Sequence, residues 1–238
     1  MTTERPDAAP APDGPGADAS VSAVIARRRS TRAFLPDPID PDLILDLLRR
    51  AARAPSGGNL QPWHATLVTG ARLDRLKDDA ATVARGSQAP EYAIYPSDLV
   101  DPYRTRRYAG GEALYAAIDV AREDRDGRLR WLARNFEFFG APAAVFLHTP
   151  RLMGPPQWAD LGMFLQSFLL LLVEAGLDAC PQEAWATLPE TVRRHVPIGA
   201  DDMLFCGVAI GRADPLHPIN ALRTERADAS EWIVHVDD

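Results

Sequence analysis

Cysteine, lysine and long apolar runs are all scarce in this chain of 238 residues. The two cysteines, Cys180 and Cys206, do not form a CxxC pattern, and the five histidines are scattered. Neither a disulfide framework nor a structural zinc site is therefore expected. Lys77 is the only lysine, and the formal net charge is −7. This acidic balance argues against nucleic acid as the main partner, because phosphate binding requires a basic surface.

No apolar run is long enough to span a membrane. The longest, residues 161–173, is about 13 residues and contains Gln166 and Ser167, whereas a spanning helix needs about 20. The first 19 residues are rich in proline, alanine and aspartate and contain no apolar segment of the kind found in signal peptides. They are predicted to form a disordered tail. The sequence thus predicts a cytoplasmic protein that does not interact with membranes.

Residues 20–238 are expected to form a single domain in which helices outnumber strands. Hydrophobic periodicity and capping residues predict helices over residues 20–29, 41–53, 71–85, 105–121, 126–138, 158–175 and 188–196. Strands are predicted over residues 64–69, 143–148, 178–180 and 203–210, with a weaker candidate at 232–236. Residues 86–104 are predicted to be irregular, as in a lid or binding segment. The pattern indicates an α+β or α/β class.

A basic segment follows the first predicted helix. It contains Arg27, Arg28, Arg29 and Arg32, together with the hydroxyl group of Ser30. Guanidinium groups combined with a hydroxyl are typical of phosphate sites. The alternative is a cationic cap on the helix dipole beside a solvated basic face.

A second polar segment, residues 54–63, has the sequence APSGGNLQPW. Its two glycines would let the backbone approach a flat ligand closely, and Ser56, Asn59 and Gln61 supply donors and acceptors. The segment matches neither the GxGxxG pattern nor the P-loop pattern. The alternative is an ordinary turn between a helix and a strand.

Taken together, these segments resemble the nitroreductase family of FMN-dependent flavoproteins. The resemblance lies in RRS-x-R-x-F followed by APSGGNxQPW, and it continues in GLDACPQEAW at residues 176–185 and NALRTER at residues 220–226. The segment RNFEFFGAP at residues 134–142 resembles the nitrobenzoate-reductase-like branch of that family. The matching segments occur in order over about residues 20–236, so the resemblance covers nearly the whole chain.

The resemblance implies an α+β fold, a three-layer α/β/α sandwich with a mostly antiparallel central sheet. It also implies a homodimer with FMN at the subunit interface. NAD(P)H would serve as co-substrate in a ping-pong cycle of hydride transfer, with small nitroaromatic or quinone-like electron acceptors. Residues 86–111 would form the substrate-side insertion, and residues 211–238 a C-terminal arm.

Site residues are carried over onto the matching positions only. The FMN phosphate and ribityl chain would be held by Arg28, Arg29 and Ser30, with Arg32 near the pyrimidine edge of the ring. The other subunit would supply Pro55, Ser56, Gly57 and Asn59. The segment beside the ring would be Gln182, Glu183 and Ala184, and Arg226, helped by Arg223, would return to the phosphate. No catalytic side chain and no metal ligand is assigned.

Some alternatives stay open at this point. The same fold could carry the chemistry of a biosynthetic dehydrogenase or oxidase, a dehalogenase or a flavin-fragmenting enzyme, or a non-enzymatic flavin-binding role. The arginines of residues 86–111 could bind an anionic substrate or the phosphates of the nicotinamide nucleotide, or they could belong to a solvated loop. Arg212 stands where relatives often carry tyrosine, which could alter the mouth through which substrate enters.

Overall fold

A computed structural model of the protein describes residues 20–237, so the predicted tail over residues 1–19 lies outside the described residues. The helices are α1 (Val21–Arg27), α2 (Pro41–Ala51), α3 (Gly70–Thr82), α4 (Tyr103–Ala117), α5 (Arg125–Ala133), α6 (Pro155–Glu174) and α7 (Pro189–His195). The strands are β1 (His64–Thr69), β2 (Ala143–Pro150), β3 (Asp178–Gln182) and β4 (Asp202–Gly211). Five short 3-10 turns, η1 to η5, connect them: Gly57–Asn59, Arg134–Gly140, Glu183–Thr187, Pro218–Ala221 and Ala229–Glu231.

The four strands form one antiparallel sheet in the order β1-β2-β4-β3. Strands β2 and β4 are central and consist of nearly continuous apolar runs, because both of their faces are covered by other elements. Strand β3 lies at one edge of the sheet, and its end leads directly into the turn Glu183–Thr187.

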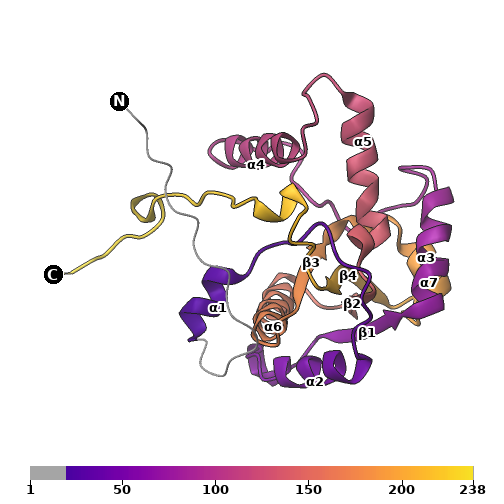
Figure 1. Ribbon diagram of the computed structural model, residues 1–238. Coiled ribbons are helices and arrows are strands. Elements are labelled where there is room, and N and C mark those ends of the chain that lie inside the picture. Colours follow the sequence, from indigo (N-terminus) through magenta and orange to yellow (C-terminus); the bar gives the residue numbers. More distant parts are fainter. Residues whose placement is uncertain (1–19, 238) are drawn as a thin grey trace.

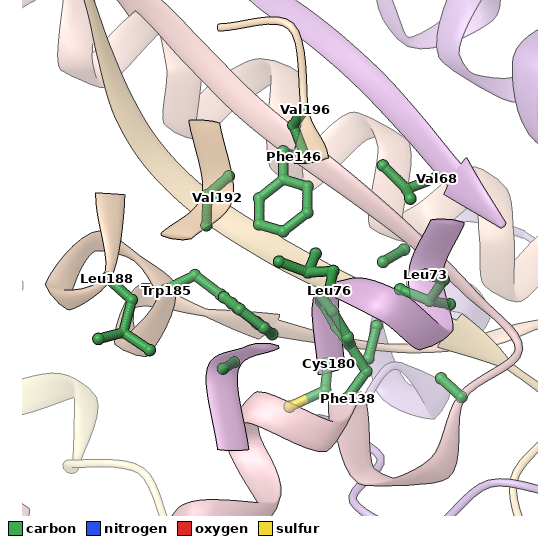
Figure 2. Close-up of a cluster of buried hydrophobic side chains, with 14 of the residues drawn as sticks. Val68, Leu73, Leu76, Phe138, Phe146, Cys180, Trp185, Leu188, Val192 and Val196 are labelled. Atoms are coloured by element: carbon green, nitrogen blue, oxygen red, sulfur yellow. The ribbon is translucent and has the colours of Figure 1, made fainter. Parts of the chain in front are cut away.

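Helical layers cover both faces of the sheet (Figure 1). On one face, α2 and α6 pack together, and Val145 and Leu147 of β2 belong to their hydrophobic cluster. On the other face, Phe146 belongs to a cluster that includes residues of α3, α7 and the turn Glu183–Thr187. Figure 2 shows the second cluster, with Trp185 among its aromatic and aliphatic side chains. The alternation along β2 therefore builds the three-layer α+β sandwich that the sequence predicts.

Helix α6 is long and apolar enough, by length and composition, to cross a membrane. In this fold it lies against the sheet, and Leu161, Phe164, Phe168 and Leu172 are buried in the core. Its remaining apolar side chains are only partly covered, and Met163 is exposed. The helix therefore serves as a core element that also presents an apolar face to the outside.

Two predictions about secondary structure are wrong. The helix predicted over residues 126–138 ends at Ala133, because Phe138 and Phe139 adopt positive φ angles of 51° and 54° in the turn Arg134–Gly140. Both rings are thereby buried in the core, which outweighs the local preference for helix. The weak strand predicted over residues 232–236 is also not formed, because this segment lies on the C-terminal arm, away from the edges of the sheet in the described chain.

Residues 86–102 contain neither helix nor strand, as predicted, yet they are tied to the sandwich. The backbone N–H of Glu91 donates to the carbonyl of Ala186 at 2.9 Å, and the Tyr92 hydroxyl donates to the carbonyl of Phe205. The chain then enters α4, which stands off the sheet (Figure 1). At the other end of the chain, the residues after Ala221 run outward as an arm with only one short turn.

Candidate functional site

The basic segment after α1 runs along the edge of the sheet at β3. Ser30 forms a parallel bridge with Ala179, and the N–H of Thr31 donates to the carbonyl of Ala179 at 3.0 Å. The N–H of Arg32 donates to the side-chain oxygen of Asn220 at 3.0 Å. These bonds hold the arginine-bearing backbone rigidly at the sheet edge, a geometry that a merely solvated basic face would not require.

Two of the predicted phosphate ligands, Arg29 and Arg223, are close enough for their charges to interact. Partial burial and the charge of Arg29 lower the pKa of the Arg223 guanidinium. Asp178 lies 3.9 Å from Arg29, too far for a hydrogen bond. The buried Nε of Arg29 has no partner among residues 20–237. Positive charge is thus in excess here, as a site for a dianion requires.

The segment Gln182–Ala184 lies where β3 passes into the next turn. Gln182 is buried, and its Nε2 donates to the backbone oxygen and the side-chain oxygen of Asn135 at 2.8 and 3.2 Å. Its Oε1 is buried and accepts no hydrogen bond from the part of the chain that the structure describes. Such an acceptor is costly unless a ligand or water satisfies it. Partial burial also raises the pKa of the Glu183 carboxyl.

A cavity of about 1110 Å³ joins these residues to the insertion. Arg32 and Pro181–Ala184 line it from the sheet edge, and the segment at Tyr95 and residues of α4 and α5 line it from the part of the chain that stands off the sheet. Aromatic and aliphatic side chains such as Trp131 and Leu132 supply much of the lining. The cavity is large enough for a flat aromatic molecule and combines apolar walls with a few polar groups, as ligand sites do.

The structure brings Arg32, Gln182, Glu183 and Ala184 to this one cavity, and places Arg28, Arg29, Ser30 and Arg223 along the adjoining edge. The four residues of the loop after α2, Pro55, Ser56, Gly57 and Asn59, do not contribute to the lining of that cavity. Their loop packs elsewhere, at the start of α6, where the Gly57 N–H donates to the buried carboxylate of Asp160 at 3.2 Å. Gly58 and Asn59 both have a φ of 58° there.

Arg226 is also not brought into the site. It lies on the outward arm, where its guanidinium donates to the carbonyl and hydroxyl oxygens of Thr224 at 3.0 and 2.8 Å. Arg212 likewise does not line the cavity in the described chain; it is exposed at the end of β4.

Two functional positions were not singled out from the sequence. Asn135 orients Gln182, and Asn220 holds the backbone of Arg32 and Ala33 while donating to Asp214. Both lie inside segments that carry the family resemblance, so the signal was present. Their roles could not be inferred because their partners lie 47 and 188 residues away.

Fold and site together define an α+β sandwich with a cationic sheet edge beside a wide, partly aromatic cavity. The chain belongs to the nitroreductase family, whose model matches residues 25–212.

Its relatives are similar over nearly their full lengths. It is 34% identical over 204 residues to a 4-nitrobenzoate reductase of Pseudomonas putida, covering 86% of this chain and 90% of that one. It is 49% identical, with a TM-score of 0.89, to the crystal structure of the FMN and NADPH-dependent nitroreductase NfnB of Sphigopyxis sp. strain HMH, covering 92% of this chain and 100% of that one. The FMN-dependent nitroreductase NfnB of Mycobacterium smegmatis, solved in complex with NADPH, is 29% identical with a TM-score of 0.87 and coverage of 91% and 97%.

Proposed function

We propose that this protein is an FMN-dependent oxidoreductase that uses NAD(P)H to reduce nitroaromatic or quinone-like acceptors by a ping-pong mechanism. The observation that carries the proposal is the basic segment that ends at Arg32, bonded to the edge of β3 and leading into the cavity that Arg32 and Gln182 both line. The similarity to named nitroreductases supports it. A cytoplasmic location, where NAD(P)H is available, is part of the same proposal.

The residues present fit FMN. The paired guanidiniums and the unpartnered Nε of Arg29 suit a phosphate dianion, and Arg28 and Ser30 add a further cation and a hydroxyl on the same strip of backbone. The unsatisfied Oε1 of Gln182 suits a ring N–H. Bound FMN would accept hydride from NAD(P)H and pass electrons to an electron-poor acceptor.

The chain's own residues bind and orient the reactants in this scheme. Arg32 supplies positive charge beside the cavity, Asn220 fixes its backbone, and Asn135 fixes the amide of Gln182. The apolar side chains of the opposite wall exclude water from the aromatic reactants. A single cavity serves donor and acceptor in turn, which is the geometry that a ping-pong cycle needs. No catalytic side chain is assigned.

A homodimer with composite sites is the second part of the proposal, in which Pro55, Ser56, Gly57 and Asn59 complete the partner's site. Three features support it. The loop does not line the cavity of its own chain, α6 presents an incompletely covered apolar face, and the C-terminal arm exposes four large apolar side chains, Trp232, Ile233, Val234 and Val236. Exposed apolar groups gathered in this way mark association surfaces.

The direct test is a visible absorption spectrum of the purified protein, followed by NADPH or NADH added without oxygen. A flavin band that either nucleotide bleaches, and that a nitroaromatic then restores, supports the proposal and identifies the donor. A band that neither nucleotide bleaches would favour a different flavin chemistry or a binding role. If no flavin is taken up from added FMN, the proposal fails.

A further inference from the structure

Arginines are concentrated on the wall of the cavity opposite Gln182. Three of the four that line this wall are paired with carboxylates: Arg104 with Asp101 at 2.8 Å, Arg106 with Glu231 at 2.6 Å, and Arg128 with Glu112 at 2.7 Å. Their charges are therefore largely compensated within the protein.

Arg107 is the fourth, and it differs from the others. It makes no ion pair or hydrogen bond through its guanidinium within residues 20–237, and its guanidinium carbon lies 4.0 Å from the centre of the Tyr95 ring. Both residues line the cavity. Stacking on an aromatic ring fixes the plane of a guanidinium while leaving the N–H groups along its edge available. Arg107 is thus an oriented cation with unused donors.

We propose that Arg107, stacked on Tyr95, binds an anionic group carried by one of the reactants in the cavity. Two groups share this chemistry: the carboxylate of an aromatic acceptor and the 2′-phosphate of NADPH. In both groups, two oxygens are spaced so that they can accept two parallel hydrogen bonds from the edge of a guanidinium. The inference rests on the proposed function, because it assigns specificity to the same cavity.

The arrangement of charge favours this assignment over a general basic surface. The protein as a whole is acidic, with a formal charge of −7, so an uncompensated cation at a cavity is selective for the anions that enter there. Arg32 lines the opposite side of the cavity. An aromatic reactant stacked on FMN that is held at Gln182 and Ala184 would therefore present a distal acidic group to Arg107.

The test uses the FMN-loaded protein and pairs of reactants of which only one member carries the acidic group in question. The acceptor pair is 4-nitrobenzoate and 4-nitrobenzamide, and the donor pair is NADPH and NADH. In Arg107→Gln, kcat/KM for at least one anionic member should fall about tenfold, the size expected for a lost charge-assisted hydrogen bond. The member of each pair that lacks the carboxylate or the 2′-phosphate should stay within about twofold. Arg107→Lys should recover only part of the loss, because an ammonium group cannot form the bidentate contact.

Arg104→Gln is the matched control. Arg104 lies on the same helix, lines the same cavity and is exposed like Arg107, but it is already paired with Asp101. Its loss should therefore leave the ratio of kcat/KM values within each pair unchanged. Tyr95→Phe should behave as wild type because it keeps the ring, whereas Tyr95→Leu should reproduce part of the Arg107→Gln loss. Dissociation constants for 4-nitrobenzoate and NADP⁺, measured from perturbation of the flavin band, give a readout independent of turnover.

A loss confined to 4-nitrobenzoate assigns Arg107 to the carboxylate, a loss confined to NADPH assigns it to the 2′-phosphate, and a loss with both assigns it to the two half-reactions in turn. Unchanged ratios and unchanged dissociation constants in Arg107→Gln would overturn the inference. Its failure is distinguishable from failure of the proposed function, because NADH oxidation by 4-nitrobenzamide tests that function with reactants that lack both the 2′-phosphate and the carboxylate.

Discussion

At the scale of single residues, the proposed function makes FMN retention depend on the positive charge at the edge of β3. Removing either guanidinium of the pair leaves a bound phosphate with one fewer charge-assisted hydrogen bond. Arg29→Ala and Arg223→Ala should each raise the dissociation constant for FMN by about 10- to 100-fold, the equivalent of about 1.5–3 kcal/mol. Titration of FMN with the flavin-free protein measures this dissociation constant.

Arg75→Ala is a suitable control for that titration, since Arg75 is exposed on α3 and does not belong to the edge of β3 or to the cavity. Arg226→Ala tests the arm separately: it should weaken FMN binding strongly if the arm returns to the phosphate in the dimer. Unchanged FMN affinity would remove Arg226 from the site while leaving Arg29 and Arg223 in place.

A second prediction at the residue scale concerns Glu91, which anchors the insertion. Its side chain is 3% exposed and accepts hydrogen bonds from Arg193 at 2.6 Å and Arg151 at 2.8 Å. Burial alone would raise the pKa of this carboxyl, but the bonds from the two arginines outweigh it and hold the pKa below its ordinary value of 4.5. Its contribution to stability is therefore complete above about pH 4.5 and is lost as pH falls through the lower folded-state pKa.

Glu91→Gln should accordingly be less stable than wild type at pH 7, by about 1–3 kcal/mol, because both arginines lose a charged partner. The difference in unfolding free energy between wild type and variant should shrink as the pH falls below about 4.5. In that range the Glu91 carboxylate of the wild type takes up a proton when the protein unfolds. Urea unfolding at each pH measures this. A difference that stays constant over that range would mean that Glu91 contributes through packing rather than through its charge.

At the scale of elements, the sequence predicts the strands well and the turns poorly. The central strands β2 and β4 are apolar runs, and the short edge strands β1 and β3 lie between turn residues, so local pattern suffices for them. The turn at Phe138 and Phe139 could not be predicted, because burial of two rings decides it. Likewise, Gln182 could be placed beside a cavity only through its family resemblance, since its partner Asn135 is distant in sequence.

Gly207 of β4 packs against the turn Glu183–Thr187, which follows the segment beside the cavity. A Cβ atom at this position of β4 would lie 2.5 Å from the ring of Trp185, in the turn that begins with Glu183. Gly207→Ala should therefore destabilise the protein by about 1–3 kcal/mol through overpacking. It should also weaken FMN binding, because the displaced ring moves the turn. The exposed Gly199, where an added Cβ meets nothing within 4 Å, gives the control Gly199→Ala. Equal urea midpoints for the two variants would contradict the prediction.

At the scale of the whole molecule, one group of predicted site residues lies away from the cavity of its own chain. The loop Pro55–Asn59 lies at the start of α6, packed on Asp160 rather than on the cavity. No sequence pattern reports which copy of a chain a loop serves, because an assembly is set by the complementarity of whole surfaces. The assignment of the loop to the partner comes from the family resemblance, and the exposed apolar surfaces only make association plausible, so it calls for a test of the assembly itself.

Complementation between two defective chains supplies that test. One chain carries Arg29→Ala with Arg223→Ala, and the other carries Ser56→Ala with Asn59→Ala; each homodimer should retain little FMN. If the sites are composite, a mixed dimer combines the intact arginines of one chain with the intact loop of the other. It then regains one of its two sites. Because random co-assembly makes half of the dimers mixed, about one quarter of the wild-type flavin content is restored.

If each loop serves its own chain, mixing restores nothing. Bound flavin per chain in the co-expressed mixture, measured by absorbance, separates these outcomes, and the separately expressed variants mixed without exchange of subunits provide the baseline.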